Sequence, residues 1–248
     1  MAILWQHHTG SDYYEVRQAG SSVRLYRNGV HHSQWNPRRP LAGSVWDLLA
    51  LPALHRSARA VDTCGVLGFG AGAVAGVLHA AAGVESIVGV ELDPMHLSVA
   101  DGFFECAEGC ELVAGDAVEW VRTQEGMGRF DMLIDDLYGE LQGEPVRCAP
   151  LDMDWFTDLA GLLRSGGMLV LNLVEPDKVP YLPPMRDAAL GARFPHRKMF
   201  WLEGYENRVV VFSESPLEEA IFRARLKDLC RAFPRCHGVG RRYRMKDL

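Results

Sequence analysis

A glycine-rich segment of five residues is the first feature of this sequence that could do chemistry. It reads Gly68-Phe69-Gly70-Ala71-Gly72. Where side chains are missing, the backbone can approach a ligand closely, and the N-terminus of a following helix attracts polar or anionic groups. Gly68, Gly70, Ala71 and Gly72 are therefore candidate cofactor-binding residues, although such a segment can also serve only to pack a helix on a strand.

Glu91 is the second candidate, about 20 residues further on, at the end of an expected strand over residues 86–91. A carboxylate in this place can accept hydrogen bonds from both hydroxyls of a ribose, each contributing about 1.5–3 kcal/mol. Leu92, the next residue, is included as a cofactor contact. The alternative role for Glu91 is that of a capping acid before the helix that begins at Pro94.

Asp116 is the third candidate and follows a short expected strand over residues 111–113. A dinucleotide enzyme needs a cradle for a pyrophosphate, whereas an enzyme that uses an adenosyl sulfonium needs an acid near the adenine amino group. Asp116, with its neighbour Ala117, fits the second class. The alternative role for Asp116 is that of the N-cap of the helix expected over residues 116–124, which the sequence does not distinguish from the first.

The segment Asp135-Asp136-Leu137-Tyr138 is the fourth candidate and ends the strand expected over residues 130–135. Neighbouring carboxylates point in different directions, and Asp136 is the one expected in the pocket, as a catalytic and cofactor-contacting residue, with Tyr138 as a second catalytic candidate. An amine acceptor with a pKa near 10.4 costs about 4.6 kcal/mol to deprotonate at pH 7, and a carboxylate that orients the amine and takes its proton addresses this cost. The alternative is a pair of solvated loop acids.

Strands and helices must alternate to bring these residues together. From Val61 the apolar pattern predicts that alternation, which is typical of a parallel sheet with helices on both faces, and ligands bind beyond the carboxyl ends of its strands. The first 35 residues instead predict antiparallel β structure around the turn Asn28-Gly29. We expect an N-terminal β-hairpin appendage and leading helix over residues 1–57, and a Rossmann-like catalytic domain over residues 58–248.

Composition limits the other classes of protein. The chain has 248 residues, of which 48% are hydrophobic, and no apolar run long enough for a membrane span, so a cytoplasmic protein without a membrane partner is expected. Six scattered cysteines indicate neither disulfides nor a metal site. Residues 85–158 carry eighteen Asp or Glu against three Arg, which indicates solvated helix faces or a surface that attracts a cationic ligand rather than nucleic acid.

With these residues placed, the chain resembles the spermidine synthases, which are polyamine aminopropyltransferases with the class I methyltransferase fold. The resemblance runs from about Ser22 to Phe212. It implies a mostly parallel seven-stranded sheet and a homodimer. By the same resemblance, the glycine segment is the family's glycine loop and Glu91 is its ribose-binding acid. Asp116 is its acid beside the adenine, and Asp136 is its first catalytic aspartate.

Three departures from the family pattern concern substrate recognition. Ala71 stands where the family has an aspartate that holds the amine of decarboxylated S-adenosylmethionine. Gly139 stands where the family has its second catalytic aspartate. Ser44-Val45 stands where the family has a Tyr-Gln pair that helps to line the acceptor site. An aspartate at position 71 would repel the carboxylate of S-adenosylmethionine, and alanine removes that repulsion.

We therefore expect an S-adenosylmethionine-dependent methyltransferase that acts on a small-molecule acceptor, such as an amine. The alternatives are a divergent aminopropyltransferase that uses decarboxylated S-adenosylmethionine and a polyamine, and an inactive homologue that serves in binding or oligomerisation.

Overall fold

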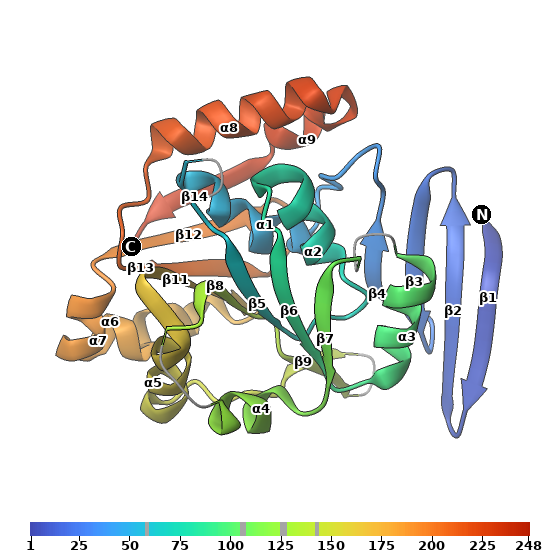
Figure 1. Cartoon of the computed structure of the whole chain (residues 1–248), viewed down its shortest axis with the longest axis horizontal. Coiled ribbons are helices and arrows are strands. Elements are labelled where there is room, and N and C mark those ends of the chain that lie inside the picture. The colour runs from blue at the N-terminus through green and yellow to red at the C-terminus, as the bar shows by residue number, and fades with distance from the viewer. Residues whose placement is uncertain (58–59, 105–107, 125–127, 142–143) are drawn as a thin grey trace.

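Eight strands form the central sheet of the chain. The computed structural model describes residues 1–57, 60–104, 108–124, 128–141 and 144–248. The sheet has the order β14-β12-β13-β11-β8-β5-β6-β7 (Figure 1). Its strands are β5 (Thr63–Leu67), β6 (Ser86–Glu91), β7 (Cys110–Ala114), β8 (Phe130–Asp135), β11 (Leu163–Leu173), β12 (His196–Leu202), β13 (Arg208–Ser213) and β14 (Tyr243–Asp247).

The direction of the chain reverses between β5 and β8. From β5 it runs outward through β6 and β7, then returns to β8 on the other side of β5, and the pairs from β7 to β11 are all parallel. The pairs β11–β13, β13–β12 and β12–β14 are antiparallel. A crevice forms at such a reversal, beyond the carboxyl ends of the two central strands.

Helices cover both faces of the sheet. Residues from α1, α2, α3 and α8 join one buried apolar cluster, and residues from α4, α5 and α7 join the other. The helices are α1 (Val45–Ala50), α2 (Ala73–Val77), α3 (Pro94–Phe103), α4 (Ala117–Thr123), α5 (Met153–Leu162), α6 (Pro183–Arg186), α7 (Ala188–Arg193), α8 (Glu219–Ala232) and α9 (His237–Gly240). None of the helices in these ranges is long and apolar enough to cross a membrane.

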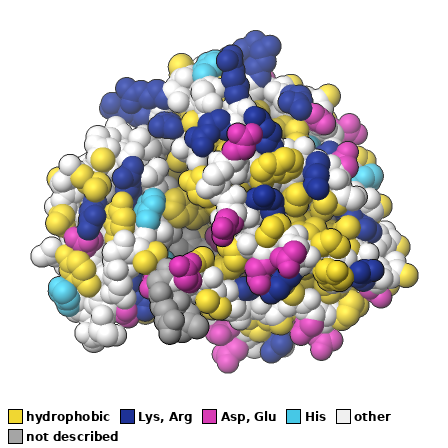
Figure 2. Space-filling model, turned by 180° about the vertical axis from the view of Figure 1, so that it is seen from behind, with side chains coloured by type: hydrophobic (Ala, Val, Ile, Leu, Met, Phe, Trp, Pro, Cys, Tyr) yellow, Lys and Arg dark blue, Asp and Glu magenta, His cyan; other side chains and the backbone are white. Residues whose placement is uncertain are grey.

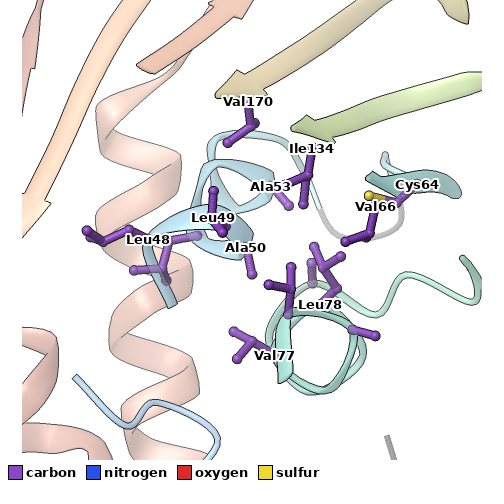
Figure 3. Close-up of a cluster of buried hydrophobic side chains, with 14 of the residues drawn as sticks. Leu48, Leu49, Ala50, Ala53, Cys64, Val66, Val77, Leu78, Ile134 and Val170 are labelled. Carbon is purple, nitrogen blue, oxygen red and sulfur yellow. The ribbon is translucent and has the colours of Figure 1, made fainter. Parts of the chain in front are cut away.

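The core follows from the alternation of side chains along the strands. Val66 and Ile134 face the first cluster, whereas Leu67 and Leu133, one residue on or before, face the second. Figure 3 shows part of the first cluster, in which side chains of α1 and α2 lie on the same side of the sheet as Ile134 and Val170. The continuous apolar runs that predicted buried strands reflect this burial on both faces.

A separate four-stranded antiparallel sheet stands at one end of the molecule, beside α2 and α3 (Figure 1). It consists of β1 (Ala2–Thr9), β2 (Asp12–Ala19), β3 (Ser22–Arg27) and β4 (Val30–Trp35), in that order. Asn28 and Gly29 form the β3–β4 turn with φ values of 51° and 84°, as a primed hairpin turn requires.

The expected α/β fold is confirmed, with additions that the sequence did not predict. The N-terminal unit is a sheet of four strands rather than a hairpin, because β1 adds to β2. The basic tail forms β14, which makes the central sheet one strand wider than the seven expected. A hairpin of β9 (Tyr138–Leu141) and β10 (Glu144–Arg147) follows β8 where a loop was expected.

Two helices change form along their length. The helix expected over residues 44–54, with a kink or split at Pro52, is α1 followed by a 3-10 turn, Leu51–His55, which confirms the split, and the helix expected over residues 71–82 is α2 followed by a π-helical turn, Leu78–Ala82. Proline cannot donate the hydrogen bond that would continue an α-helix, which explains the first change. The expected end of the helix over residues 94–106, Cys106, lies outside the described residues.

Charged side chains cover the surface with an uneven distribution. Figure 2 shows dark-blue Lys and Arg side chains gathered toward the end of the molecule that carries α8 and α9 in Figure 1, and magenta Asp and Glu side chains toward the opposite end. Within residues 85–158, acids such as Glu85, Glu111 and Asp154 are exposed, as the interpretation of this segment as solvated faces predicts.

Phe69 fixes the glycine-rich segment to the sheet. Its side chain is 2% exposed, and a Cβ atom at Gly89 of β6 would lie 2.2 Å from the Cδ2 atom of Phe69. The aromatic ring therefore occupies the space that a side chain at position 89 would need. Phe69 and Gly89 hold the turn after β5 against β6, which is the place where Glu91 ends that strand.

We predict that Gly89→Ala lowers the free energy of unfolding by about 1–3 kcal/mol, because the ring of Phe69 must move to admit the added methyl group. Denaturant titration measures the change. Gly102→Ala is the matched control, since Gly102 lies in α3 with open space around it and alanine should stabilise the helix by up to about 1 kcal/mol. Equal stability of the two variants would contradict this role of Phe69.

Candidate functional site

A cavity of about 820 Å³ opens at the carboxyl ends of the central strands. Its lining includes Gly68, Gly70, Glu91 and Asp136, together with residues of β3, β4 and the loop before α1. A smaller cavity of about 80 Å³ shares Gly68, Glu91, Leu92 and Tyr138 with it and extends toward Asp116. The parallel sheet thus brings the four separate motifs of the sequence to one continuous hollow.

Gly68 allows the loop after β5 to meet the loop after β8. Its φ is 82°, and a Cβ atom there would lie 2.3 Å from the carbonyl oxygen of Asp136. The N–H group of Asp136 donates to the carbonyl oxygen of Leu67 at 2.9 Å. A side chain at position 68 would push these two backbones apart, so glycine is required by contact as well as by conformation.

Glu91 is bound to the glycine-rich segment by a direct hydrogen bond. The N–H group of Gly70 donates to Glu91 Oε2 at 2.8 Å, and the N–H group of Asp93 donates to Glu91 Oε1 at 3.0 Å. Burial raises the pKa of Glu91 above its ordinary value, although these two hydrogen bonds oppose the shift. Each carboxylate oxygen can accept a further hydrogen bond, so Glu91 remains able to bind a hydroxyl pair.

Leu92, Asp116 and Ala117 line the smaller cavity. Leu92 is 70% exposed, so a flat apolar ligand in this cavity could cover it. Asp116 is the N-cap of α4, since its Oδ1 atom accepts from the N–H groups of Val118 at 2.7 Å and Glu119 at 3.2 Å. The capping role of Asp116 is therefore present, and its other carboxylate oxygen makes none of the hydrogen bonds found among the described residues.

The two aspartates at the end of β8 face different surroundings. Asp135 is completely buried, and its Oδ2 atom lies 2.5 Å from Arg147 Nη2 and accepts from Trp155 Nε1 at 2.9 Å. Asp136 lines the cavity and has no cationic partner within ion-pair distance among the described residues. Asp135 therefore has a structural role, and Asp136 is the carboxylate that a ligand can reach.

Asn172 holds Asp136 in place. Its Nδ2 atom donates to Asp136 Oδ1 at 2.7 Å, and its Oδ1 atom accepts from Asn207 Nδ2 at 3.0 Å. Burial raises the pKa of Asp136 to about 6, and the hydrogen bond from Asn172 acts in the opposite direction. Asp136 is thus a carboxylate at pH 7 that binds a proton more readily than an ordinary aspartate.

Tyr138 lines both cavities, and its hydroxyl group is already engaged. The hydroxyl donates to the carbonyl oxygen of Asn172 at 3.1 Å and accepts from the N–H group of Val174 at 3.2 Å. Burial raises the pKa of this phenol. These contacts favour a positioning role at the end of β11, and a catalytic role for Tyr138 stays a prediction.

Ala71 and Gly72 are not among the residues that line either cavity. Ala71 is completely buried, and its N–H group donates to Ser33 Oγ of β4 at 3.2 Å. Gly72 is the N-cap of α2, with φ of 84°. Ser33 of the N-terminal sheet thus contacts this half of the glycine segment, and Gly68 and Gly70 are the two of the four predicted residues in the segment that line a cavity.

Two histidines from distant segments meet beside the glycine segment and were not predicted. The rings of His32 in β4 and His96 in α3 lie 5.0 Å apart, and both line the larger cavity with buried Nε2 atoms that have no hydrogen-bond partner. Burial lowers the pKa of each to about 4, so both are neutral at pH 7. His32 is the extra residue of a β-bulge, a feature that redirects side chains next to sites.

The loop before α1 closes the cavity on its N-terminal side. Gly43 and Ser44 line it, and both donate their backbone N–H groups to Asp47 Oδ2, at 2.6 and 3.2 Å. The hydroxyl group of Tyr243 in β14 donates to the same oxygen at 2.6 Å. Burial raises the pKa of Asp47 even though these donors oppose the shift. The C-terminal strand therefore helps to hold the loop in place.

The sheet order, the glycine turn after β5 and the acid after β6 together define the class I methyltransferase fold, which spermidine synthases share. Among solved structures, a probable spermidine synthase from Corynebacterium glutamicum superposes with a TM-score of 0.72 at 18% identity, covering 100% of this chain and 91% of that chain. Human Methyltransferase-like protein 13, solved in complex with SAH, superposes with a TM-score of 0.51 at 20% identity, covering 81% of this chain and 90% of that chain.

The sequence comparisons are narrower. An eEF1A lysine and N-terminal methyltransferase homolog of Drosophila pseudoobscura pseudoobscura is 30% identical over 151 residues. The match covers 58% of this chain and 22% of that protein, so this chain corresponds to about a fifth of its curated relative. No family model matches the sequence. The likeness therefore establishes the fold, which the expected resemblance had named.

We predict that Asn172→Ala raises the pKa of Asp136 further above about 6, because it removes the hydrogen bond that favours the carboxylate form. Carboxyl carbon NMR of aspartate-labelled protein measures the titration, and Asp136→Asn identifies the signal by its loss. An unchanged or lowered midpoint would show that Asn172 does not control this carboxylate.

Proposed function

We propose that this chain is a transferase that binds an adenosyl sulfonium donor, and that it transfers the methyl group of S-adenosylmethionine to a small acceptor such as an amine. The observation that carries the proposal is the placement of Glu91 and Asp136 on one cavity, with Gly68 and Gly70 between them. A ribose acid and a carboxylate without a cationic partner are the groups that binding and reaction at the 5′ end of a nucleoside require.

The residues present fit an adenosyl group. Glu91 retains acceptor capacity for the ribose hydroxyls, and Leu92 offers an exposed apolar surface beside it. Asp116 stands on the smaller cavity, where its second carboxylate oxygen can accept from an amino group. Both cavities share Gly68, at which the backbone lies open because no side chain is present.

Asp136 supplies the acid–base part of the proposed reaction. With a pKa of about 6, it is ionised at pH 7 and can accept a hydrogen bond or a proton from an ammonium group. When bound, the sulfonium donor supplies an electrophilic methyl carbon. Asp136, held by Asn172, orients the acceptor so that its freed lone pair lies in line with the carbon–sulfur bond, whose electrons return to sulfur as the bond breaks.

The choice of donor rests on the residues that the pocket lacks. Position 71 carries alanine, which is buried and lines neither cavity, and Gly139 lines the larger cavity where a second acid would bind an amine. Neither position therefore offers an acid that could bind a cationic tail of the donor. This favours S-adenosylmethionine over its decarboxylated form.

Three alternatives remain open to the same experiments. Aminopropyl transfer is favoured by the match of the whole chain, N-terminal sheet included, to a probable spermidine synthase. A protein acceptor is favoured by the sequence likeness to a homolog of a lysine and N-terminal methyltransferase. A homologue that only binds would retain neither transfer activity.

We predict that the protein binds S-adenosylhomocysteine and that Glu91→Gln weakens this binding by about 10- to 100-fold, because the charge-assisted hydrogen bonds to the ribose are lost. Isothermal titration calorimetry measures the affinity. The free energy of unfolding should also fall, by about 1–3 kcal/mol, because the single oxygen of glutamine can accept from only one of the N–H groups of Gly70 and Asp93. Glu85→Gln, an exposed acid outside both cavities, is the control and should bind as the wild type does.

The donor is identified in the same titration. Tighter binding of decarboxylated S-adenosylmethionine than of S-adenosylmethionine would overturn methyl transfer in favour of aminopropyl transfer. If neither donor nor S-adenosylhomocysteine binds, the chain is not a transferase of this class.

We predict that Asp136→Asn lowers turnover by about 100-fold or more while donor affinity stays nearly constant. In the wild type, turnover should fall as the pH drops below about 6, because Asp136 is protonated there and can no longer accept a proton. The measurement is release of S-adenosylhomocysteine across a panel of primary amines and peptides with lysine or a free N-terminus.

The pH profile provides the internal check. The residual activity of Asp136→Asn should lack the decline near pH 6. A fully active variant, or an unchanged decline in the variant, would remove Asp136 from the mechanism.

A further inference from the structure

The N-terminal wall of the larger cavity carries positive charge. Arg24 of β3 and Arg39 of the loop after β4 both line it. Neither guanidinium has a carboxylate within 4.0 Å in the described ranges, whereas Arg27, which also lines the cavity, is paired with Asp12 at 2.8 Å and with Asp93 at 3.7 Å. Arg24 and Arg39 are therefore cations with no acid bound to them.

Both arginines lie near the C-terminal end of β4. Arg24 lies opposite Gln34 in the register, and its Nε atom donates to Gln34 Oε1 at 2.6 Å. After Trp35 the chain turns, since the N–H group of Arg39 donates to the carbonyl oxygen of Asn36 at 3.0 Å. The turn returns Arg39 toward the strand end at which Arg24 lies.

Arg39 is incompletely hydrogen-bonded although it is partly buried. Its Nη2 atom donates to the carbonyl oxygen of Ala42 at 3.3 Å, and its Nε atom is buried without a partner. A guanidinium presents its donors in a planar fork that matches a carboxylate. A carboxylate on the cavity side would satisfy the donors that the protein leaves unused.

The neighbouring groups do not change this charge. His32 and His96 are neutral at pH 7, Asp93 is engaged by Arg27 and by the hydroxyl group of Tyr14 at 2.7 Å, and Glu91 is bound by the backbone of the glycine segment. Asp136, directly after β8, and Glu140, in the hairpin that follows it, are the further acids that line the cavity. The two free arginines therefore favour an anionic group at their own wall, and a polyamine, every charged group of which is positive, would have to bind away from them.

We propose that Arg24 and Arg39 bind a carboxylate of one of the two substrates, which deepens the proposed transfer reaction and rests on it. The carboxylate comes from the methionyl tail of the donor or from the acceptor. Decarboxylated S-adenosylmethionine with a polyamine would bring no anion to these residues.

Calorimetry with three probes tests the proposal. S-adenosylhomocysteine has the adenosyl group and a tail carboxylate, its decarboxylated form lacks the carboxylate, and methylthioadenosine lacks the charged tail. Arg24→Met, Arg39→Met and the double variant are compared with Arg38→Met, a control in the same turn whose exposed side chain lies outside the cavity. Circular dichroism confirms that each variant is folded.

If the carboxylate belongs to the donor, Arg24→Met, Arg39→Met and the double variant lose tenfold or more in affinity for S-adenosylhomocysteine and keep their affinity for the other two probes. Arg38→Met keeps its affinity for all three probes. Arg39→Lys should retain part of the affinity that Arg39→Met loses. An acceptor carboxylate predicts equal binding of all three probes by every variant, together with succinate binding to the wild type that the double variant loses.

The succinate titration is run with and without methylthioadenosine, so that carboxylate binding is measured even if no nucleoside binds. The proposal is overturned if the wild type binds no succinate and does not prefer S-adenosylhomocysteine to its decarboxylated form, or if the cavity variants behave as Arg38→Met does. Failure of all nucleosides to bind the wild type would contradict the proposed transfer reaction separately.

Discussion

The close contact of two backbones, at Gly68 and Asp136, is the constraint on which the site depends. β5 and β8 are neighbours in the sheet but lie on opposite sides of the reversal in strand order, so their following loops must cross at short range. A Cβ atom at position 68 would stand 2.3 Å from the carbonyl oxygen of Asp136. Because no side chain separates the loops, Glu91 and Asp136, the two carboxylates of the proposed site, line the same cavity.

The motifs that were predictable are those set by local pattern and by the geometry of parallel sheets. Glycines after one buried strand, and acids after the next three, must come together when strands run in the same direction. Gly68, Gly70, Glu91 and Asp136 therefore meet in the structure, and Asp116 lies beside them. Ala71 could not be placed in this way, because its burial depends on Ser33 in the separate N-terminal sheet.

The features that were missed depend on distant partners. β14 has a polar sequence and is a strand because β12 offers it a free edge, and β9 and β10 are strands because each pairs with the other. His32 faces the site because of a bulge that no local signal announces. Asn172 did leave a signal in the sequence, since it is a polar residue within the apolar run 168–173, and a polar residue in a buried strand must find hydrogen bonds. In the structure it is 4% exposed.

The bond between Tyr243 and Asp47 also orders events in time. Asp47 organises the loop at Gly43 and Ser44, and its buried carboxylate is only fully supplied with donors once the tyrosine hydroxyl has arrived from the other end of the chain. During synthesis, the parallel strands and the loops that line the two cavities are made well before residue 243. A chain that ends before β14 would therefore carry Gly68, Glu91 and Asp136 but would lack the hydroxyl donor that Tyr243 supplies to Asp47.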